Sequence, residues 1–274
     1  MISHATRRWL WLLALVGVSA GAVAAHTHYD GRLPRLAYLS GWALFGLMLL
    51  LTAYNARKKL PFLPLLSSRT WLEFHVYAGL FTAVLFGLHI RGRMPAGAFE
   101  IALAALFASV TLSGIVGLFL SRVLPARLTT AGGEVPFERI PSIRHALRVQ
   151  AETLALESAP GSRSTILADF YLRRLKEFFD GPRHFWPHVF EVRRPLNRLL
   201  QETADLNRYV DEKDRAALEQ LAALVRQKNG LDYHRALQLV LKGWLFVHIP
   251  LTYSLLLVTV AHIVLVFAFS GGSR

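Results

Sequence analysis

The chain of 274 residues contains no cysteine at all. This absence excludes disulfides, zinc–thiolate centres, iron–sulfur clusters and thioether-attached haem, all of which need a thiol. Any bound metal or haem must therefore be held by histidine, methionine, tyrosine or carboxylate side chains. The sequence also lacks a Gly-rich phosphate loop and a dinucleotide-binding fingerprint, so it offers no motif for a nucleotide.

Acidic residues are scarce outside one polar stretch. Residues 121–240 carry a net charge of +4, whereas the rest of the chain carries +9 and only three acids, Asp30, Glu73 and Glu100. Most of the excess basic charge therefore lies in the short flanks of apolar segments, where Lys and Arg set membrane orientation. A nucleic-acid partner would need the charge gathered on one soluble face, and we expect no nucleic-acid binding.

Hydrophobic residues make up 53% of the chain and are concentrated in five long runs. Each run is close to the ~20 residues that a helix needs to cross ~30 Å of hydrocarbon. The runs are Trp9–Ala25, Leu36–Tyr54, Trp71–Ile90, Phe99–Leu120 and Gly243–Phe269. We therefore predict an all-α integral membrane protein. Residues 1–122 form transmembrane helices one to four, 123–240 a helical cytoplasmic insert, and 241–274 the fifth transmembrane helix.

The first run has two interpretations. Arg7 and Arg8, an apolar stretch and then small residues at 22–25 also describe a secretory signal peptide. The apolar stretch is long for a signal peptide and long enough to span a membrane, so we favour a retained helix and keep a cleaved signal as the alternative.

The distribution of basic residues predicts the orientation. The N-terminus and second loop hold Arg7, Arg8, Arg57, Lys58, Lys59 and Arg69, whereas the first loop, third loop and C-terminus hold Arg32, Arg35, Arg91, Arg93 and Arg274. By the positive-inside rule the N-terminus and the long insert are cytoplasmic, in a bacterial-type inner (plasma) membrane. The third and fifth spans then run in the same direction.

The insert is expected to be helical. Apolar residues recur at three- and four-residue spacing over 142–157, 165–179, 194–209 and 213–228. Pro160-Gly161, Gly181-Pro182 and Asn229-Gly230 are the expected breaks between these helices. We expect the insert to dock a partner or to brace the bundle, with a solvated helical insert as the alternative.

Four histidines lie inside predicted spans: His75 and His89 in the third, and His248 and His262 in the fifth. Both pairs are fourteen residues apart. This spacing is close to four helical turns and about 21 Å, so each pair projects from one face, with one histidine near each side of the hydrocarbon.

If the two spans are parallel and face each other, His75 is level with His248 and His89 with His262. Each level then offers two imidazoles, as the axial ligands of a low-spin b-type haem do, and we predict two haem b groups. An ionisable side chain in hydrocarbon is costly unless it is partnered, which makes such histidines functional candidates. Hydrogen bonding to a neighbouring helix is the structural alternative.

Cationic side chains flank these histidines. Arg69 and Lys242 precede His75 and His248, and Arg91 and Arg93 follow His89. They are candidate partners of haem propionates, and ordinary interfacial anchoring is the alternative for each. Gly79 and Gly87 in the third span could let a macrocycle or another helix approach closely.

The motifs Phe74-His75, Gly79 and Leu88-His89, with Val247-His248 and Ala261-His262, resemble the ferric-reductase-like transmembrane domain. The resemblance covers about half of the chain and implies a dihaem membrane cytochrome that conducts electrons between a cytoplasmic reductant or quinol and the opposite face. Two departures are a missing sixth span with its flavin and nicotinamide domain, and a long insert. The expected partners are lipid and other redox subunits: a cytoplasmic flavin or iron–sulfur protein, or a periplasmic cytochrome.

Two other functions remain open. Cytochrome b subunits that oxidise quinol or reduce quinone have a similar doubled spacing, so a quinone is a further candidate ligand, and the chain could also anchor an assembly. A metal or proton transporter could use the same histidines, but relays mix them with acids at mid-depth, and Glu73 and Glu100 lie at span ends.

His184 and His188 are four residues apart, yet prolines interrupt that segment and no third zinc ligand is evident.

Overall fold

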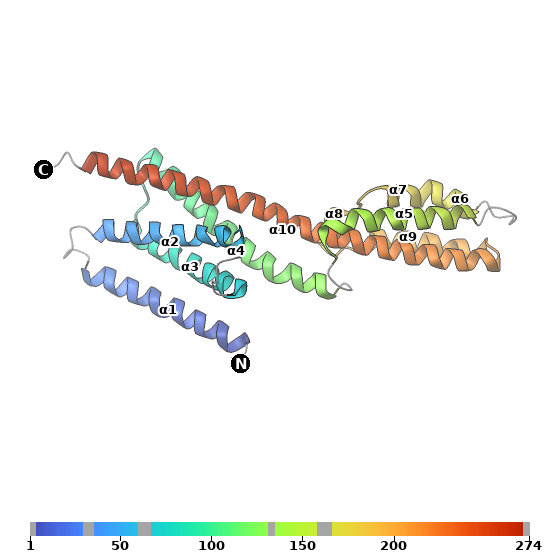
Figure 1. Ribbon diagram of the computed structural model, residues 1–274, viewed down its shortest axis with the longest axis horizontal. Coiled ribbons are helices and arrows are strands. Elements are labelled where there is room, and N and C mark those ends of the chain that lie inside the picture. Colours follow the sequence, from blue (N-terminus) through green and yellow to red (C-terminus); the bar gives the residue numbers. More distant parts are fainter. Residues whose placement is uncertain (1–3, 30–35, 60–66, 131–134, 158–165, 271–274) are drawn as a thin grey trace. The chain divides into compact units, whose positions relative to one another are not determined.

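A computed structural model describes residues 4–29, 36–59, 67–130, 135–157 and 166–270 of the chain. Over these residues the chain is helical and contains no strand. Figure 1 shows the order of the helices along the chain. The chain divides into two compact units, of which one comprises residues 1–119 and 244–274 and the other residues 120–243.

The helices of the first unit agree with the five predicted apolar runs. They are α1 (His4–Tyr29), α2 (Leu36–Lys59), α3 (Ser68–His89), the greater part of α4 (Ala98–Thr130) and the C-terminal part of α10 (Glu212–Ser270). All five of these helices are long and apolar enough to cross a membrane. The predicted all-helical fold with five apolar helices is confirmed at this level.

The ends of α3 follow from local chemistry. The Ser67 hydroxyl accepts a hydrogen bond from the backbone N–H of Thr70 and so caps the first turn. At the other end, Arg91 and Gly92 both have positive φ angles, 52° and 65°, which stop the helix just after His89. The cap and the stop therefore place His75 and His89 at opposite ends of one regular helix.

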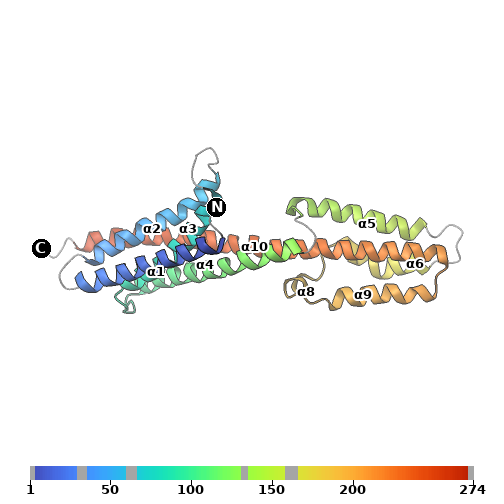
Figure 2. The same cartoon turned by 90° about the horizontal axis from the view of Figure 1, so that it is seen from below.

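Both α1 and α2 pack on α3, as Figures 1 and 2 show. The core of this unit gathers one or two side chains from each of four helices: Leu44 and Met48 of α2, Leu85 of α3, Phe107 of α4 and Leu255 of α10. The rings of Phe86 and Phe107 stack with centroids 4.1 Å apart. These contacts hold α2, α3, α4 and α10 together around one apolar centre.

The outer faces of these helices are also apolar. Trp9, Leu112, Phe246 and Leu257 are between 63% and 81% exposed. Contiguous apolar faces of this kind would be unfavourable in water, whereas hydrocarbon accommodates them.

An ion pair and a hydrogen bond join α1 to α3. The Arg7 guanidinium lies 2.6 Å from the Glu73 carboxylate, and the Trp11 indole N–H donates to the same carboxylate at 3.1 Å. One turn further along, the rings of Trp11 and Tyr77 stack with centroids 5.6 Å apart. The first helix therefore contacts α3 through both polar and aromatic side chains.

The second unit contains the end of α4, the first part of α10 and the helices between them. These are the 3₁₀ turn η1 (Phe137–Arg139), α5 (Ile140–Glu157), α6 (Ile166–Phe170), the π-helical η2 (Tyr171–Leu175), α7 (Lys176–Asp180), α8 (Phe185–Val189), α9 (Arg194–Asp205) and the 3₁₀ turn η3 (Leu206–Arg208). The predicted helices over 142–157 and 194–209 are confirmed, and α7 ends just before the predicted break at Gly181-Pro182.

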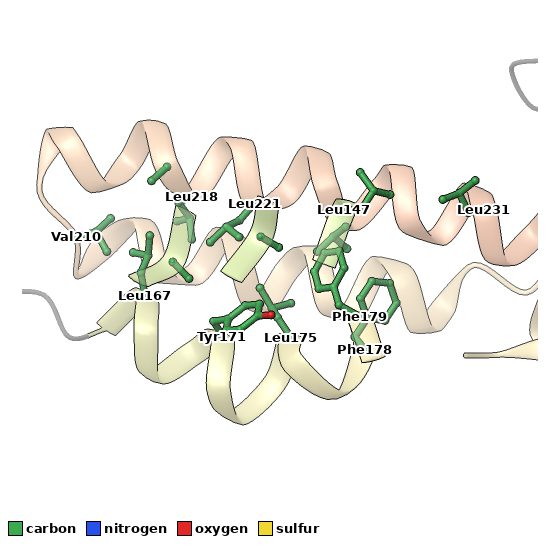
Figure 3. Packing of buried hydrophobic residues seen from close by; sticks show 14 of the residues in the cluster. Leu147, Leu167, Tyr171, Leu175, Phe178, Phe179, Val210, Leu218, Leu221 and Leu231 are labelled. Atoms are coloured by element: carbon green, nitrogen blue, oxygen red, sulfur yellow. The ribbon is translucent and has the colours of Figure 1, made fainter. Parts of the chain in front are cut away.

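The core of this unit lies between α10 and the helices beside it (Figure 3). Leu218, Leu221 and Val225 of α10, at three- and four-residue spacing, are almost fully buried against Tyr171 and Phe179. A smaller cluster joins the end of α4 to α10 through Leu124, Leu128 and Leu237. The apolar face of α10 read from the sequence is therefore the face that forms the core.

The predicted break at Asn229-Gly230 is wrong, because both residues lie inside α10. One glycine costs a helix only about 1 kcal/mol, and burial on either side offsets it. Lys228, fully buried, donates to Asp232 at 2.6 Å and to the carbonyl of Gly181 at 2.7 Å. This buried pair spans the expected break and also fixes the loop after α7.

Some expectations fall on residues that the structure leaves undescribed. Arg32, Arg35, Arg274 and the break at Pro160-Gly161 lie outside the described residues, as do the side chains of Arg57, Lys58 and Lys59.

Candidate functional site

His89 and His262 line one cavity in the first unit, although they lie on α3 and α10. The cavity has a volume of about 300 Å³, and its other walls come from α2 and α4. Its lining is mostly aliphatic and aromatic, including Leu44, Phe107 and Leu255 of the apolar core. Two imidazoles thus meet in a largely apolar space, the kind of pocket that binds organic cofactors.

The imidazole of His89 is held from one side by α2. Its Nδ1 shares a hydrogen bond with the Ser40 hydroxyl at 3.1 Å. Gly41 follows Ser40, and a Cβ added there would lie only 3.0 Å from Cε1 of the ring. The ring therefore packs against the backbone of α2, and a glycine at position 41 is what permits this approach.

His262 has an aromatic neighbour from α4. The rings of Phe99 and His262 stack with centroids 6.2 Å apart. Thr259, one turn earlier on α10, also lines the cavity, but its hydroxyl donates to the carbonyl of Leu255 in its own helix. The two histidines are therefore the strongest ligand donors among the lining residues.

The second intramembrane pair has different surroundings. His75 packs against Tyr54 of α2, with ring centroids 5.1 Å apart. Nδ1 of His248 shares a hydrogen bond with the Ser113 hydroxyl of α4 at 3.2 Å. The structure thus places these histidines against α2 and α4 respectively, and their pairing remains a prediction.

Trp244 supports His248 from one turn earlier on α10. The two rings stack with centroids 5.3 Å apart, and the indole N–H donates to the carbonyl of Ser113 at 2.8 Å. A Cβ at Gly117 would overlap the Trp244 ring, so the glycine makes room for it. Trp244 is therefore a direct neighbour of His248.

Sequence reasoning missed Ser40 and Ser113. Each is a hydroxyl within an apolar run, and each contacts Nδ1 of one histidine. A single serine in such a run is a usable signal, because a polar side chain in hydrocarbon needs a partner. Position alone does not tell which histidine it meets, since the contact joins separate helices.

Within the part of the chain that the structure describes, Gly79 and Gly87 of α3 are not points of close helix packing. A Cβ added at Gly79 or Gly87 would meet no atom within 4 Å. The close approaches instead use Gly41 of α2 and Gly117 of α4. The alternative that Gly79 and Gly87 allow close helix packing therefore has no support from these contacts.

The four candidate propionate partners are distributed as follows. Arg69 lies 3.3 Å from the Glu73 carboxylate. In the second unit, Lys242 lies 3.4 Å from Glu138 and 3.6 Å from the centre of the Phe137 ring. Arg91 and Arg93 are exposed after the end of α3. Arg69 and Lys242 thus have protein partners of their own, and the propionate role of all four remains a prediction.

The other histidines form no metal centre within the described residues. No group of three or more His, Asp or Glu side chains that could hold an ion occurs there. The rings of His184 and His188 lie 6.5 Å apart, and burial lowers the pKa of His188 below its ordinary value. A haem differs from a free ion, because its porphyrin supplies four ligands and the protein only two.

The residues around His89 and His262 fit such a group. The possible donors are two imidazole side chains, the walls are apolar, and the Ser40 hydroxyl shares a hydrogen bond with one of the two rings. Among the described residues, no Asp or Glu side chain lines the cavity.

Comparison with known proteins identifies no relative: no protein-family model, curated protein or solved structure matches this chain.

Proposed function

We propose that the chain is a membrane cytochrome b subunit that transfers electrons across the bilayer through two bis-histidine haems. The observation that carries the proposal is the meeting of His89 and His262 in one apolar cavity. Two imidazoles from separate helices in an apolar space are the side chains that would hold a haem iron.

The chain's own residues would orient the ligands. Because Nδ1 of His89 shares a hydrogen bond with Ser40, its Nε2 would be the nitrogen that holds a haem iron, and Ser113 has the same relation to His248. Such outer partners fix the tautomer and the ring plane of a ligating histidine. When bound, a b-type haem supplies one-electron redox chemistry at its iron.

The two proposed haem sites rest on different observations. His89 and His262 line one cavity, whereas the pairing of His75 with His248 rests on the repeated fourteen-residue spacing. At a rise of 1.5 Å per residue, the two histidines of each helix are about 21 Å apart along the helix axis. Two redox centres at these levels would divide the membrane crossing into shorter steps.

A transport function has less support. Glu73 is engaged by Arg7 and Arg69, and Glu100 is in the first turn of α4 and exposed. Neither acid offers a relay partner to the intramembrane histidines, as proton or metal pathways usually need. A quinone in the cavity of His89 and His262 is the remaining alternative, and quinol-dependent reduction would reveal it.

The proposal fits a subunit of a larger redox system. A flavin or iron–sulfur protein on the cytoplasmic side, or a periplasmic cytochrome, would exchange electrons with it, and the N-terminus and residues 123–240 would face the cytoplasm. The positive-inside rule, applied to the basic residues of the loops in the sequence, supports this orientation.

Transfer across the bilayer can be tested in liposomes that contain ferricyanide and carry the purified protein. Dithionite added outside should bleach the enclosed ferricyanide faster than in protein-free liposomes, and the variant His262→Ala should abolish the difference. Equal bleaching with and without a haem-loaded protein would contradict the proposal. Ser109→Ala is the matched control, because that hydroxyl is exposed and bonds only to Ala105 in its own helix.

A further inference from the structure

The short helix α8 in the second unit has one buried and one exposed face. His188 is only 7% exposed, and its ring lies against Tyr233 with centroids 6.0 Å apart. Phe185 and Trp186 of α8 and Phe190 just after it are exposed, and we call these three residues the aromatic face. His184 and Glu191, which lie on either side of α8, both have positive φ angles.

The aromatic face is a contiguous apolar surface. Trp186 and Phe190 are 63% and 70% exposed, and their rings stack with centroids 5.9 Å apart. The rings of Phe185 and Trp186 meet edge to face at 5.1 Å. Large aromatic side chains that touch one another on the outside of a folded unit mark an interaction site.

Several bonds hold α8 in place. Arg127 near the end of α4 donates to the carbonyl of Val189 at 3.2 Å and lies 3.3 Å from the Glu191 carboxylate. The Tyr233 hydroxyl of α10 donates to the same carboxylate at 3.2 Å. These contacts therefore fix α8, and with it the aromatic face, on the fold.

Basic residues flank the aromatic face on both sides. Arg183 and His184 precede it in the chain, and Arg193 and Arg194 follow it. A cavity of about 460 Å³ is lined by Arg174, Arg183, His184, Arg194 and Arg198, together with Glu177 and Glu202. Both carboxylates are already paired, Glu177 with Arg183 and Glu202 with Arg174. The cavity keeps an excess of positive charge, including Arg194, which forms no ion pair with the described residues.

The position of α8 along the chain points to one partner. Arg127 lies seven residues after Leu120, where the apolar run of α4 was predicted to end. At a rise of 1.5 Å per residue the two are about 10 Å apart along the helix. The bonds to Arg127 therefore hold α8 near the predicted end of the apolar run of α4.

We propose that the aromatic face is a lipid-docking surface that lies in the headgroup layer of the bilayer, with the flanking arginines on anionic phospholipid phosphates. Trp and Phe side chains concentrate at this depth, and arginine binds phosphate oxygens in pairs. This inference needs α4 to cross a membrane but does not depend on haem binding.

The cysteine-free chain allows a direct test. Phe190→Cys in the full-length protein is labelled with a nitroxide in nanodiscs of phosphatidylglycerol and phosphatidylcholine. The control is Tyr209→Cys, because Tyr209 is an equally exposed aromatic (69%) of the same unit that lies outside the aromatic face. Collision with oxygen, which concentrates in lipid, is compared with collision with a water-soluble nickel chelate.

We expect an oxygen-to-nickel ratio several-fold higher at position 190 than at position 209. Equal ratios would show an aqueous surface and overturn the proposal. A label shielded from both reagents would show a protein partner or a second copy, and would overturn it too. The variant Arg193→Gln with Arg194→Gln should lower the ratio at position 190, and an unchanged ratio would refute the role of the arginines.

Discussion

His89 of α3 and His262 of α10 line the same apolar cavity, although most of the chain separates them in sequence. The Ser40 hydroxyl shares a hydrogen bond with the His89 ring, and the Phe99 ring stacks on the His262 ring. The proposed haem function and the first two predictions below follow from the presence of both imidazoles in this cavity.

The first prediction concerns the ligands. His262→Ala should remove one haem and largely spare the other, because the other level would keep both of its histidines. The haem content of the purified variant, measured as the pyridine haemochrome, should fall to about half of that of the unaltered protein. Full retention of both haems would refute the pairing of His89 with His262.

The second prediction concerns the hydrogen bond to His89. Ser40→Ala removes the hydroxyl at 3.1 Å from Nδ1 and should weaken haem binding by roughly 10–100-fold, the usual cost of losing an outer partner. Haem transfer to an excess of apomyoglobin reports this change as a faster loss. Ser109→Ala should leave the rate unchanged, and a similar rate in both variants would show that Ser40 does not orient the ligand.

The third prediction concerns the space beside His248. Gly117→Ala should displace the Trp244 ring and break its bond to Ser113, with a loss of about 1–3 kcal/mol for overpacking. Thermal unfolding in detergent should show a lower midpoint. Gly46→Ala on α2 is the control, because a Cβ there meets no atom within 4 Å and alanine favours the helix. Equal midpoints for the two variants would contradict the packing of Trp244.

The fourth prediction concerns pH. The hydrogen bond from Arg174 lowers the pKa of Glu202 below its ordinary value of 4.5. The carboxylate therefore stabilises the folded state above pH 4.5, and this stabilisation is lost as the pH falls through the lowered pKa. Glu202→Gln should reduce the melting temperature at pH 7 but not in strong acid. Glu219→Gln, at an exposed position of α10, is the control, and a pH-independent difference for Glu202→Gln would count against the ion pair.

Much of the fold could be predicted because its signals are local. Long apolar runs set the five helices, and the three- and four-residue spacing of Leu218, Leu221 and Val225 set the buried face of α10. The break at Asn229-Gly230 failed because tertiary burial of Lys228 and Asp232 outweighs a weak local preference. The aromatic face of α8 was not recognised, since exposure depends on contacts that sequence periodicity does not contain.

The site could be predicted only in part. The repeated spacing singled out His75, His89, His248 and His262, and the structure brings His89 and His262 to one cavity. The spacing could not reveal Ser40, Gly41 or Ser113, because each of them contacts a histidine of another helix. Interhelical contacts depend on the rotation of each helix about its axis, which near-uniform apolar runs leave undetermined.

The central claim is tested most directly by the dithionite-reduced minus oxidised absorption spectrum of the purified protein, with a pyridine haemochrome assay for stoichiometry. The protein should be produced in cells well supplied with haem and kept in mild detergent. We predict sharp bands of low-spin b-type haem and close to two haems per chain. A folded protein without haem would contradict the account and return the four histidines to transport or to helix packing.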